Sequence, residues 1–374
     1  MARITGGELV LRTLEANGVR HLFGIPGNHA LPIFDALNDS PIEFIQVRHE
    51  QSAAYMADAY ARVTGGPGVL ATITGPGALN TAAALGNAYY DSSPVVAIAS
   101  NVPRMSLYRS RGMLHESRDQ LAAFQAISKW AGRAVAATEI PERVDAAFRQ
   151  VLNGRPRPAY VEIPSDVLFE EAEIGLPLPS ASHSRAAADP ATIARAVDLL
   201  RASRRPLVWA GGGVNRSCAE AALHAVAELL GAPVITTTQG RGAFPASHPL
   251  AVRTAAGDRP LRDWIAGHDL VLAVGTRFTQ EATATWRTRM PRTLIHIDAD
   301  IEEIGKNYPT ALGIPADAAL ALEQLLDALQ VAGVARLGDR TREVAELNER
   351  AVAYYRSAMP CEVEVMDAIR AGTP

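Results

Sequence analysis

The fold is decided by residues 68–99, which begin with GVLATITGPGALNTAAALGNAYY at 68–90 and end with PVVAIA at 94–99. Two short apolar runs in this stretch, Gly68–Thr72 and Val95–Ala99, have the length and residue types of buried strands. The alanine-rich run Leu79–Tyr90 between them has the length of a helix. Strands that alternate with helices are typical of a parallel sheet, so this stretch predicts an α/β domain with helices on both faces of its sheet.

The same alternation extends toward the N-terminus. Thr5 and Glu8 have the spacing of a capping box, which predicts a helix that begins after Thr5 and stops at Asn17-Gly18. Another helix is expected from about Glu50 to the glycines at positions 65 and 66. The other elements expected here are the strands Val19–Phe23 and Ile42–Val47 and the helix His29–Leu37.

A second α/β pattern begins at Pro190, after prolines at 156, 158 and 164 that are expected to mark the end of the first unit. Its expected strands are Leu207–Ala210, Val234–Thr237, Leu270–Val274 and Thr293–Ile297, and its closing helix is Ala318–Leu329. We therefore predict two doubly wound parallel-sheet domains, at residues 1–175 and 190–332, joined by a Pro- and Ser-rich linker at 176–189. Residues 333–374 are expected to form a polar helical connector and the start of a further helix over Cys361–Ile369.

The composition excludes several classes of function. The 374 residues carry a net charge of −4 without long runs of one sign, which argues against a nucleic-acid groove or an anionic membrane as partner. No apolar run reaches the ~20 residues of a membrane span. Cys218 and Cys361 are far apart and form neither a disulfide framework nor a zinc motif, so we expect no metal ligands in this chain. The first ten residues do not match a signal peptide, and we expect a cytoplasmic protein.

The motifs of the first domain lie in a specific order. They are GIPGNHALPIFDAL at 24–37, RHEQSAAYMADAYAR at 48–62, TGPGALNT at 74–81 and SSPVVAIASNVPR at 92–104. The second domain adds RPLVWAGGGV at 205–214 and LIHIDADIEEIGKN at 294–307. In this order and spacing the chain resembles the N-terminal pyrimidine-binding domain and the central, Rossmann-like domain of the thiamine-diphosphate enzymes that include acetolactate synthase and 2-oxo acid decarboxylases. The resemblance covers nearly the whole chain.

The resemblance implies thiamine diphosphate as cofactor and Glu50 as its activating carboxylate. The cofactor provides an electron sink, and a carboxylate must bond its aminopyrimidine ring nitrogen and exchange a proton there. Such a carboxylate should be buried, so that it holds a proton near neutral pH. Glu50 stands where a strand ends and a helix begins, which is the sheet edge where open α/β folds bind ligands. Taken alone, an acidic residue in a first helical turn needs no such role, because the helix dipole favours it.

Further site residues follow from the same resemblance. The glycine-containing turns at 24–27 and 75–77 let backbone approach a ligand closely, although two such turns also occur without a ligand. The residues expected to bind the cofactor are Ile25, Pro26, Gly27, Glu50, Thr74, Gly75, Pro76 and Asn80. Those expected to take part in the chemistry beside Glu50 are Asn28, His29 and His115.

Two departures from the family pattern concern the reaction. Relatives that only decarboxylate often carry Asp where this chain has Asn28, and a His-His pair where it has a single His115 followed by Glu116. Acetolactate synthases carry Gln at the His115 position, and relatives resembling benzoylformate decarboxylase have His where this chain has Ile73. His115 is an acid–base candidate by its ordinary pKa, and the alternative is a solvent-exposed loop histidine.

The second domain binds FAD in acetolactate synthases. Arg277 and Asp298 match positions near that site, but the loop around Ala255–Arg259 is short and lacks the flavin pattern. Gly211-Gly212-Gly213 is not a full GxGxxG motif. We therefore expect that FAD is not retained and that this domain is structural.

The diphosphate and Mg²⁺ site of the family is not found in the sequence. That site needs a Gly-Asp-Gly motif in a third domain, and the chain contains none. We expect the chain to be one subunit of a split enzyme, active on a 2-oxo acid by decarboxylation or carboligation. A partner subunit would hold Mg²⁺, and this chain would form a homodimer within a heterotetramer. The alternatives are a non-catalytic binding or regulatory paralogue, a truncated product and a flavin-binding component.

Overall fold

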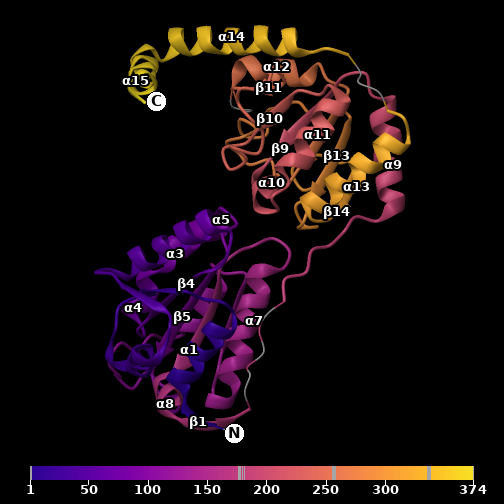
Figure 1. Ribbon diagram of the computed structural model, residues 1–374. Coiled ribbons are helices and arrows are strands. Elements are labelled where there is room, and N and C mark those ends of the chain that lie inside the picture. The colour runs from indigo at the N-terminus through magenta and orange to yellow at the C-terminus, as the bar shows by residue number, and fades with distance from the viewer. Residues whose placement is uncertain are drawn as a thin grey trace. The chain divides into compact units, whose positions relative to one another are not determined.

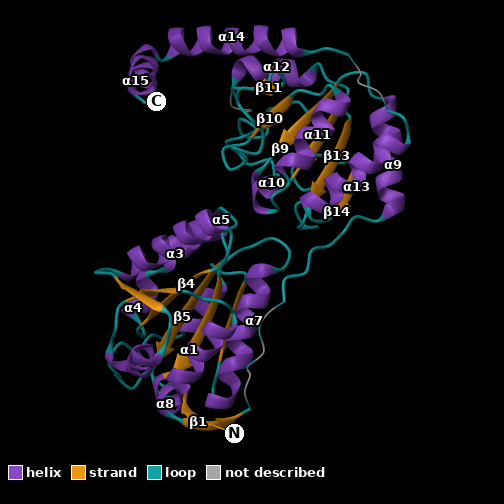
Figure 2. Ribbon diagram, viewed as in Figure 1, coloured by secondary structure: helices purple, strands orange, loops and turns teal. Residues whose placement is uncertain are grey.

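The computed structural model describes residues 2–175, 178, 180, 182–254, 258–334 and 338–373. The chain divides between Ser184 and Arg185 into two compact units, each built around its own six-stranded parallel sheet (Figures 1 and 2). The prediction of two doubly wound α/β domains is therefore confirmed. None of the helices described is long and apolar enough to cross a membrane.

The first unit has the strand order β3-β2-β4-β5-β7-β6, and all neighbours are parallel. These strands are β2 (His21–Gly24), β3 (Glu43–Gln46), β4 (Gly68–Thr72), β5 (Val95–Asn101), β6 (Trp130–Arg133) and β7 (Ala159–Pro164). A small antiparallel pair, β1 (Ala2–Thr5) with β8 (Glu171–Ile174), lies apart from this sheet. The main helices are α1 (Gly6–Ala16), α3 (Glu50–Thr64), α5 (Ala82–Tyr90), α6 (Gln120–Gln125), α7 (Ile140–Leu152) and α8 (Ser165–Phe169).

Alternation along the central strands gives this sheet two apolar faces. Val69 and Ala71 of β4 belong to the core that contains α1 and α7, whereas Leu70 belongs to the core that contains α3, α5 and α6. Successive side chains of a strand point to opposite faces, so helices cover both sides of the sheet. Because the six strands are parallel, their C-terminal ends all lie at one edge of the sheet, which we call the carboxyl edge.

Local signals set the helix ends. The Thr5 side chain accepts a hydrogen bond from the Glu8 amide at 3.2 Å, as the capping-box spacing predicted, and α1 ends before Asn17. Helix α3 begins at Glu50, as predicted, and is capped by Gly65 in the left-handed region at φ 75°.

Other sequence-based boundaries were wrong. The helix expected over His29–Leu37 is instead a 3₁₀ turn η1 (Asn28–Ala30), a short helix α2 (Leu31–Asp35) and a second 3₁₀ turn η2 (Ala36–Asp39). Pro32 explains the break, because proline has no N–H and is tolerated only in the first turn of a helix. The helix expected over Leu79–Tyr90 is likewise two helices, α4 (Pro76–Asn80) and α5.

The second unit has the strand order β11-β10-β9-β12-β13-β14, again parallel throughout. Its strands are β9 (Pro206–Ala210), β10 (Val234–Thr236), β11 (Ala251–Val252), β12 (Leu270–Val274), β13 (Thr293–Asp298) and β14 (Leu312–Pro315). Its helices are α9 (Pro190–Ala202), α10 (Gly212–Arg216), α11 (Glu220–Leu230), α12 (Arg259–Ala266), α13 (Ala318–Val331), α14 (Thr341–Ala358) and α15 (Pro360–Gly372). Val208 of β9 belongs to the core that contains α9, α11 and α13. Trp209 belongs to the core on the other face, which contains α12 and α14.

A buried polar cluster ties the start of α14 to this second sheet. Arg340 donates to the Pro206 carbonyl at 3.0 Å and contacts His268 Nε2 at 2.8 Å, and it forms an ion pair with Glu343. His268 Nδ1 lies 2.9 Å from the Trp264 carbonyl, so Nδ1 carries the proton and Nε2 accepts from Arg340. Burial, and then the charge of Arg340, lowers the pKa of His268 to about 4. His268 is therefore neutral at physiological pH.

Candidate functional site

Glu50 lies at the carboxyl edge of the first sheet. Three residues separate it from the end of β3, and it is the first helical residue of α3. The preceding residue, His49, caps the helix, because its Nδ1 accepts from the Gln51 amide at 3.2 Å. The turn after β2 and the turn after β4 leave the same edge, since β3, β2 and β4 are successive parallel neighbours. The fold thus brings the three predicted motifs of the first domain to one place.

The Glu50 carboxylate is held by one partner from the neighbouring turn. Its Oε2 accepts a hydrogen bond from Asn80 Nδ2 at 2.9 Å. A Cβ placed on Gly77 would lie 2.4 Å from Ile73 Cγ2 and 3.3 Å from Glu50 Oε1, so glycine is what lets this turn approach the carboxylate closely. The side chain is half-buried in this chain, not buried as expected. Glu50 stands in the first turn of a helix at the edge of the sheet.

Gly75 is the tightest point of the turn after β4. It has φ +62°, and a Cβ at this position would lie 2.1 Å from the backbone oxygen of His115. Both facts require glycine, because another residue would be strained and would collide with backbone. The turn at Thr74–Gly77 and the loop that carries His115 are therefore in direct contact.

His29 and His115 face each other near this contact. Their ring centroids are 6.2 Å apart and the rings are nearly perpendicular, at 87°. His29 is only 8% exposed, and its Nδ1 has no hydrogen-bond partner among the residues that the structure describes. Burial, and then the nearby His115, lowers the pKa of His29, so its ring is neutral at pH 7. His115 is half-buried and has φ +61°.

The turn after β2 provides the remaining predicted residues. Pro26 and Asn28 are exposed, and Ile25 is half-buried and packs against the core beneath α3. A Cβ on Gly27 would lie 2.6 Å from Ile73 Cδ1, so the two turns touch through this glycine. Thr74 is fully buried below them. Whether these side chains bind a cofactor stays a prediction.

Comparison with known proteins identifies this arrangement. Residues 4–123 match the sequence model of the N-terminal TPP-binding domain of thiamine pyrophosphate enzymes, and residues 193–325 match that of their central domain. The chain belongs to this family of thiamine diphosphate (pyrophosphate) enzymes. The two matched regions correspond to the two units of the structure.

Three relatives show how much of a family member is present. A probable acetolactate synthase large subunit of Methanocaldococcus jannaschii is 38% identical over 333 residues, which are 87% of this chain and 56% of that protein. A probable 2-ketoarginine decarboxylase of Pseudomonas aeruginosa is 36% identical over 390 residues, covering 99% of this chain and 66% of that protein. An acetolactate synthase of Mycobacterium bovis is 36% identical over 351 residues, covering 88% and 54%. The chain spans between about half and two thirds of the length of these relatives.

The residues at the edge fit the aminopyrimidine end of the family's cofactor. The hydrogen bond from Asn80 goes to Glu50 Oε2, and among the described residues no hydrogen bond to Oε1 is formed. The unpartnered Nδ1 of His29 adds a second polar atom at the same edge. A protonated ring nitrogen suits the Glu50 oxygen that has no partner in the described part of the chain. None of these residues offers the cluster of oxygen ligands that Mg²⁺ requires.

The structure also shows a site residue that sequence reasoning missed. Gln120, at the start of α6, is 1% exposed, and its Oε1 accepts from the Gly75 amide at 2.7 Å. A single glutamine outside the motifs carries no signal of this contact in the sequence. Its position after the capping residue Asp119 was the one local cue, and that cue predicts only a helix start.

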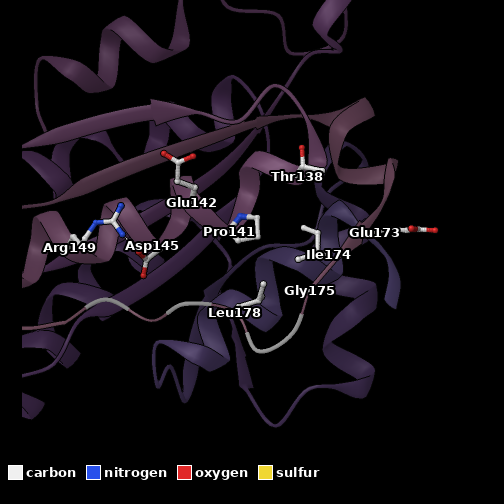
Figure 3. Close-up of a pocket in the computed structure, with 9 residues that line it drawn as sticks. All are labelled: Thr138, Pro141, Glu142, Asp145, Arg149, Glu173, Ile174, Gly175 and Leu178. Atoms are coloured by element: carbon white, nitrogen blue, oxygen red, sulfur yellow. Dashed lines mark hydrogen bonds and ion pairs between the residues drawn. The ribbon is translucent and has the colours of Figure 1, made fainter. Parts of the chain in front are cut away.

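A shallow pocket of the first unit lies elsewhere. Its lining comes from α7 with Thr138 before it and from the end of β8 with Gly175 and Leu178 after it, and it includes the ion-paired Asp145 and Arg149 (Figure 3). Neither Glu50 nor any other predicted site residue lines it. We assign it no role.

At the corresponding edge of the second unit, two glycine-containing loops pack closely against each other. The amides of Gly211 and Gly213 donate to the carbonyls of Val274 and Gly275 at 2.8 and 3.0 Å. A Cβ on Gly213 would lie 2.6 Å from Gly275 Cα, so these glycines allow two loops to touch. The expectation about FAD also concerned residues 255–257, which lie outside the described residues, and it stays a prediction.

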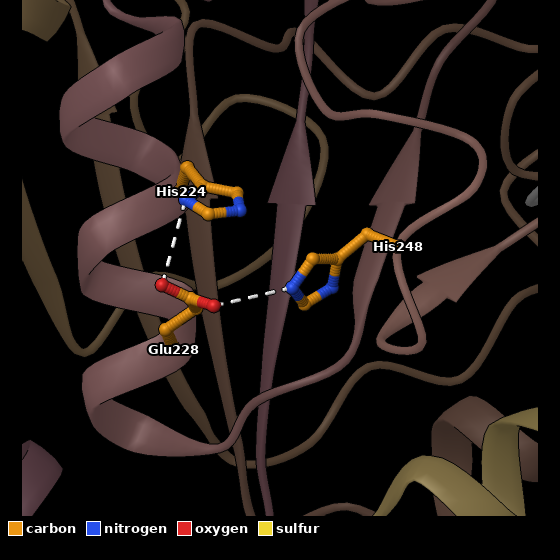
Figure 4. A group of neighbouring side chains, drawn as sticks. All are labelled: His224, Glu228 and His248. Carbon is orange, nitrogen blue, oxygen red and sulfur yellow. Dashed lines mark hydrogen bonds and ion pairs between the residues drawn. The ribbon is translucent and has the colours of Figure 1, made fainter.

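A histidine–glutamate cluster in the second unit resembles a metal site in composition. His224 and Glu228 of α11 and His248 of the facing loop place ligand atoms within 4.8 Å of one another (Figure 4). However, His248 Nδ1 accepts from the Leu250 amide at 3.1 Å, so Nε2 carries the proton and donates to Glu228 at 3.3 Å. Metal binding at Nε2 would move that proton to Nδ1, opposite the Leu250 N–H. The observed bonds are those of a hydrogen-bonded cluster.

Proposed function

We propose that this chain supplies the aminopyrimidine half of a thiamine-diphosphate site that acts on a 2-oxo acid. The observation that carries the proposal is Glu50, whose Oε2 accepts a hydrogen bond from Asn80 while Oε1 has no hydrogen-bond partner among the described residues. Bound thiamine diphosphate supplies the electron sink for cleavage or formation of a carbon–carbon bond. Glu50 would bind the ring nitrogen through Oε1 and exchange a proton there.

His29 and His115 would handle protons on the substrate side. His29 is neutral, because its pKa is lowered, and can therefore accept a proton or donate one through its protonated nitrogen. Its ring orientation is set by burial, and His115 lies across from it at the contact with Gly75. The names of the relatives support decarboxylation, carboligation to an acetolactate-type product, or both. FAD has no part in the proposed chemistry.

The diphosphate and Mg²⁺ would be held by a Gly-Asp-Gly domain on a partner subunit. The sequence contains no such motif, and the matched family domains are the N-terminal and central ones. Large apolar side chains that are 41–45% exposed lie on the helices that carry the site, and these are Tyr55, Met56, Leu79 and Tyr90. Such a group of exposed side chains favours burial by another chain. We propose a homodimer of this chain within a cytoplasmic heterotetramer.

The test is a binding titration with and without a partner. The partner candidate is the product of an adjacent gene that encodes a Gly-Asp-Gly domain. Thiamine diphosphate with Mg²⁺ is titrated into the purified chain alone and into the co-purified complex by calorimetry. We expect heat of binding with the complex only, because most of the ligand's charge is on the diphosphate. Micromolar affinity of the chain alone would contradict the proposal, and a chain that ignores the partner would favour a non-catalytic paralogue.

A further inference from the structure

A buried carboxylate beneath the site has no role in the chemistry proposed above. Glu162 of β7 is 0% exposed. It accepts from Asn101 Nδ2 at 3.0 Å and from Gln120 Nε2 at 3.3 Å, and it forms an ion pair with Arg133 of β6. A buried charge is retained only when it is paired and hydrogen-bonded. These contacts account for both of its oxygens.

One branch of this network leads to the turn beside Glu50. The Gln120 amide nitrogen also reaches the Ser100 carbonyl at 2.9 Å and the Tyr160 hydroxyl at 2.7 Å, which leaves Oε1 to accept from Gly75. The Ser100 hydroxyl accepts from the Thr74 amide at 3.0 Å. Two consecutive amides of the turn are therefore held by buried side chains. These two hydrogen bonds hold the backbone of the turn in the conformation that has φ +62° at Gly75.

The other branch leads to the loop that carries His115. Arg133 Nη1 donates to the Tyr108 hydroxyl at 2.8 Å, and its guanidinium carbon lies 5.1 Å from the centre of the Tyr108 ring. Burial alone would lower the pKa of Arg133, but the Glu162 charge and the Tyr108 hydroxyl raise it above its ordinary value. Within the loop, Glu116 accepts from the amides of Gly112 and Met113 at 2.7 and 3.1 Å.

We propose that Gln120, Arg133 and Glu162 are positioning residues that hold these two segments in one arrangement. The Gln120 branch fixes the Thr74–Gly77 turn against Glu50, and the Arg133 branch fixes the 104–116 loop against the turn. Glu162 joins the branches, so one ion pair sets the distance between the carboxylate and the histidine sides of the site. The role assigned to this arrangement rests on the proposed function.

Hydrogen exchange on the purified full-length chain, without cofactor or partner, tests the arrangement itself. The readouts are peptides from 73–80 and 105–117, with α7 as the reference for global opening. Q120A should speed exchange in 73–80 by about tenfold, the effect of leaving one buried amide unpaired, and leave 105–117 within about twofold. Y108F should speed exchange in 105–117 and leave 73–80 within about twofold. E162Q should speed exchange in both peptides.

Control variants distinguish a local effect of Q120A from a general loss of stability. Q125A removes an exposed glutamine at the other end of α6 and should change neither peptide. Exchange in 73–80 within about twofold of wild type in Q120A, or a rise equal to that in α7, would overturn the proposal. If Q120A does not fold, Y108F still tests the proposal. Tyr108 is 60% exposed, so removing its hydroxyl does not disturb the core.

A second readout separates positioning from chemistry. In the complex with the Gly-Asp-Gly subunit, Q120A should raise the thiamine diphosphate concentration for half-maximal activity by about tenfold, while saturating cofactor restores turnover to within about threefold. Glu50→Gln should leave exchange in both peptides unchanged and lower turnover at saturating cofactor. Normal activity in the Glu50 variant would therefore refute the proposed function, and unchanged exchange in Q120A would refute the positioning role.

Discussion

The two units have the same architecture but use their carboxyl edges differently. In the first, the edge brings together a carboxylate with one open oxygen, two facing histidines and a glycine turn. In the second, Gly213 and Gly275 pack backbone against backbone at the corresponding edge. A parallel sheet thus provides the place for a site, and loop residues decide whether that place can do chemistry.

Each unit also has an ion-pair network around a largely buried arginine, and the two networks serve different segments. Arg133 with Glu162 supports the loops around Glu50. Arg340 with Glu343 and His268 fastens α14 to the second sheet. Breaking either network should therefore affect different properties of the protein.

The largest difference is expected from the carboxylates. In the assembled enzyme, Glu50→Gln should lower turnover by about 10²–10⁴-fold, because Gln can bond a ring nitrogen but cannot exchange its proton. Glu302→Gln, an exposed carboxylate after β13 of the second unit, is the matched control and should leave turnover unchanged. Steady-state rates with pyruvate and other 2-oxo acids at saturating cofactor provide the measurement. Activity of the Glu50 variant within tenfold of wild type would remove Glu50 from the mechanism.

A smaller effect is expected from the histidine side. His115→Ala should lower turnover by roughly 10²-fold while changing the affinity for thiamine diphosphate by less, since the role proposed for His115 is proton transfer. His183→Ala, an exposed histidine near the end of the first unit, serves as the control. Kinetics and calorimetry on the same preparations compare the two quantities. If both stay at wild-type values, His115 is only a structural loop residue.

A pH effect on stability is expected from the second unit. The pKa of His268 falls from 6.5 to about 4 on folding, so the unfolded chain binds a proton first as pH decreases. This contribution to stability is complete above pH 6.5 and is lost as pH falls toward 4, with a loss of roughly 2 kcal/mol between pH 7 and pH 5. Urea unfolding of wild type and His268→Gln at these two pH values measures the difference. The same slope in both proteins would show that His268 does not set it.

The smallest effect concerns association. Met56→Glu on α3 should raise the dissociation constant of the homodimer by about tenfold or more, because it places a charge in an apolar contact. Val331→Glu at the end of α13, where the side chain is 90% exposed, should leave association unchanged. Sedimentation equilibrium over a range of concentrations distinguishes the two. Equal dimerisation of both variants would place the interface away from α3.

The sequence predicted the elements whose ends carry their own local signals. Strand β4 and the start of α3 were predicted to the residue, since apolar runs, a strand–helix junction and terminal glycines mark them. Strand β7 was missed because Pro158 and Pro164 suggested an end to the unit. It forms between them, where a proline at the last strand position withholds no needed N–H from the sheet interior.

Only the site residues that lie within the sequence motifs were predictable. Glu50, Gly75 and Asn80 stand within quoted motifs, and the structure brings them together. Gln120 lies 45 residues from the amide that it holds, and Glu162 lies 42 residues beyond Gln120. Contacts at such separations depend on strand order, which local patterns do not encode. The network beneath the site was for this reason absent from the sequence-based expectations.

The contact at Gly75 limits how this protein can be redesigned or can evolve. A side chain there would overlap the backbone oxygen of His115, and the overlap involves no movable side-chain atom. Replacing the His115 side chain leaves that oxygen in place, so residue 115 can be varied by point mutation without changing this contact. Exchanging the whole loop for one of another length cannot be done independently of the turn. Loop grafts from relatives should therefore carry both segments together, as a single exchangeable cassette.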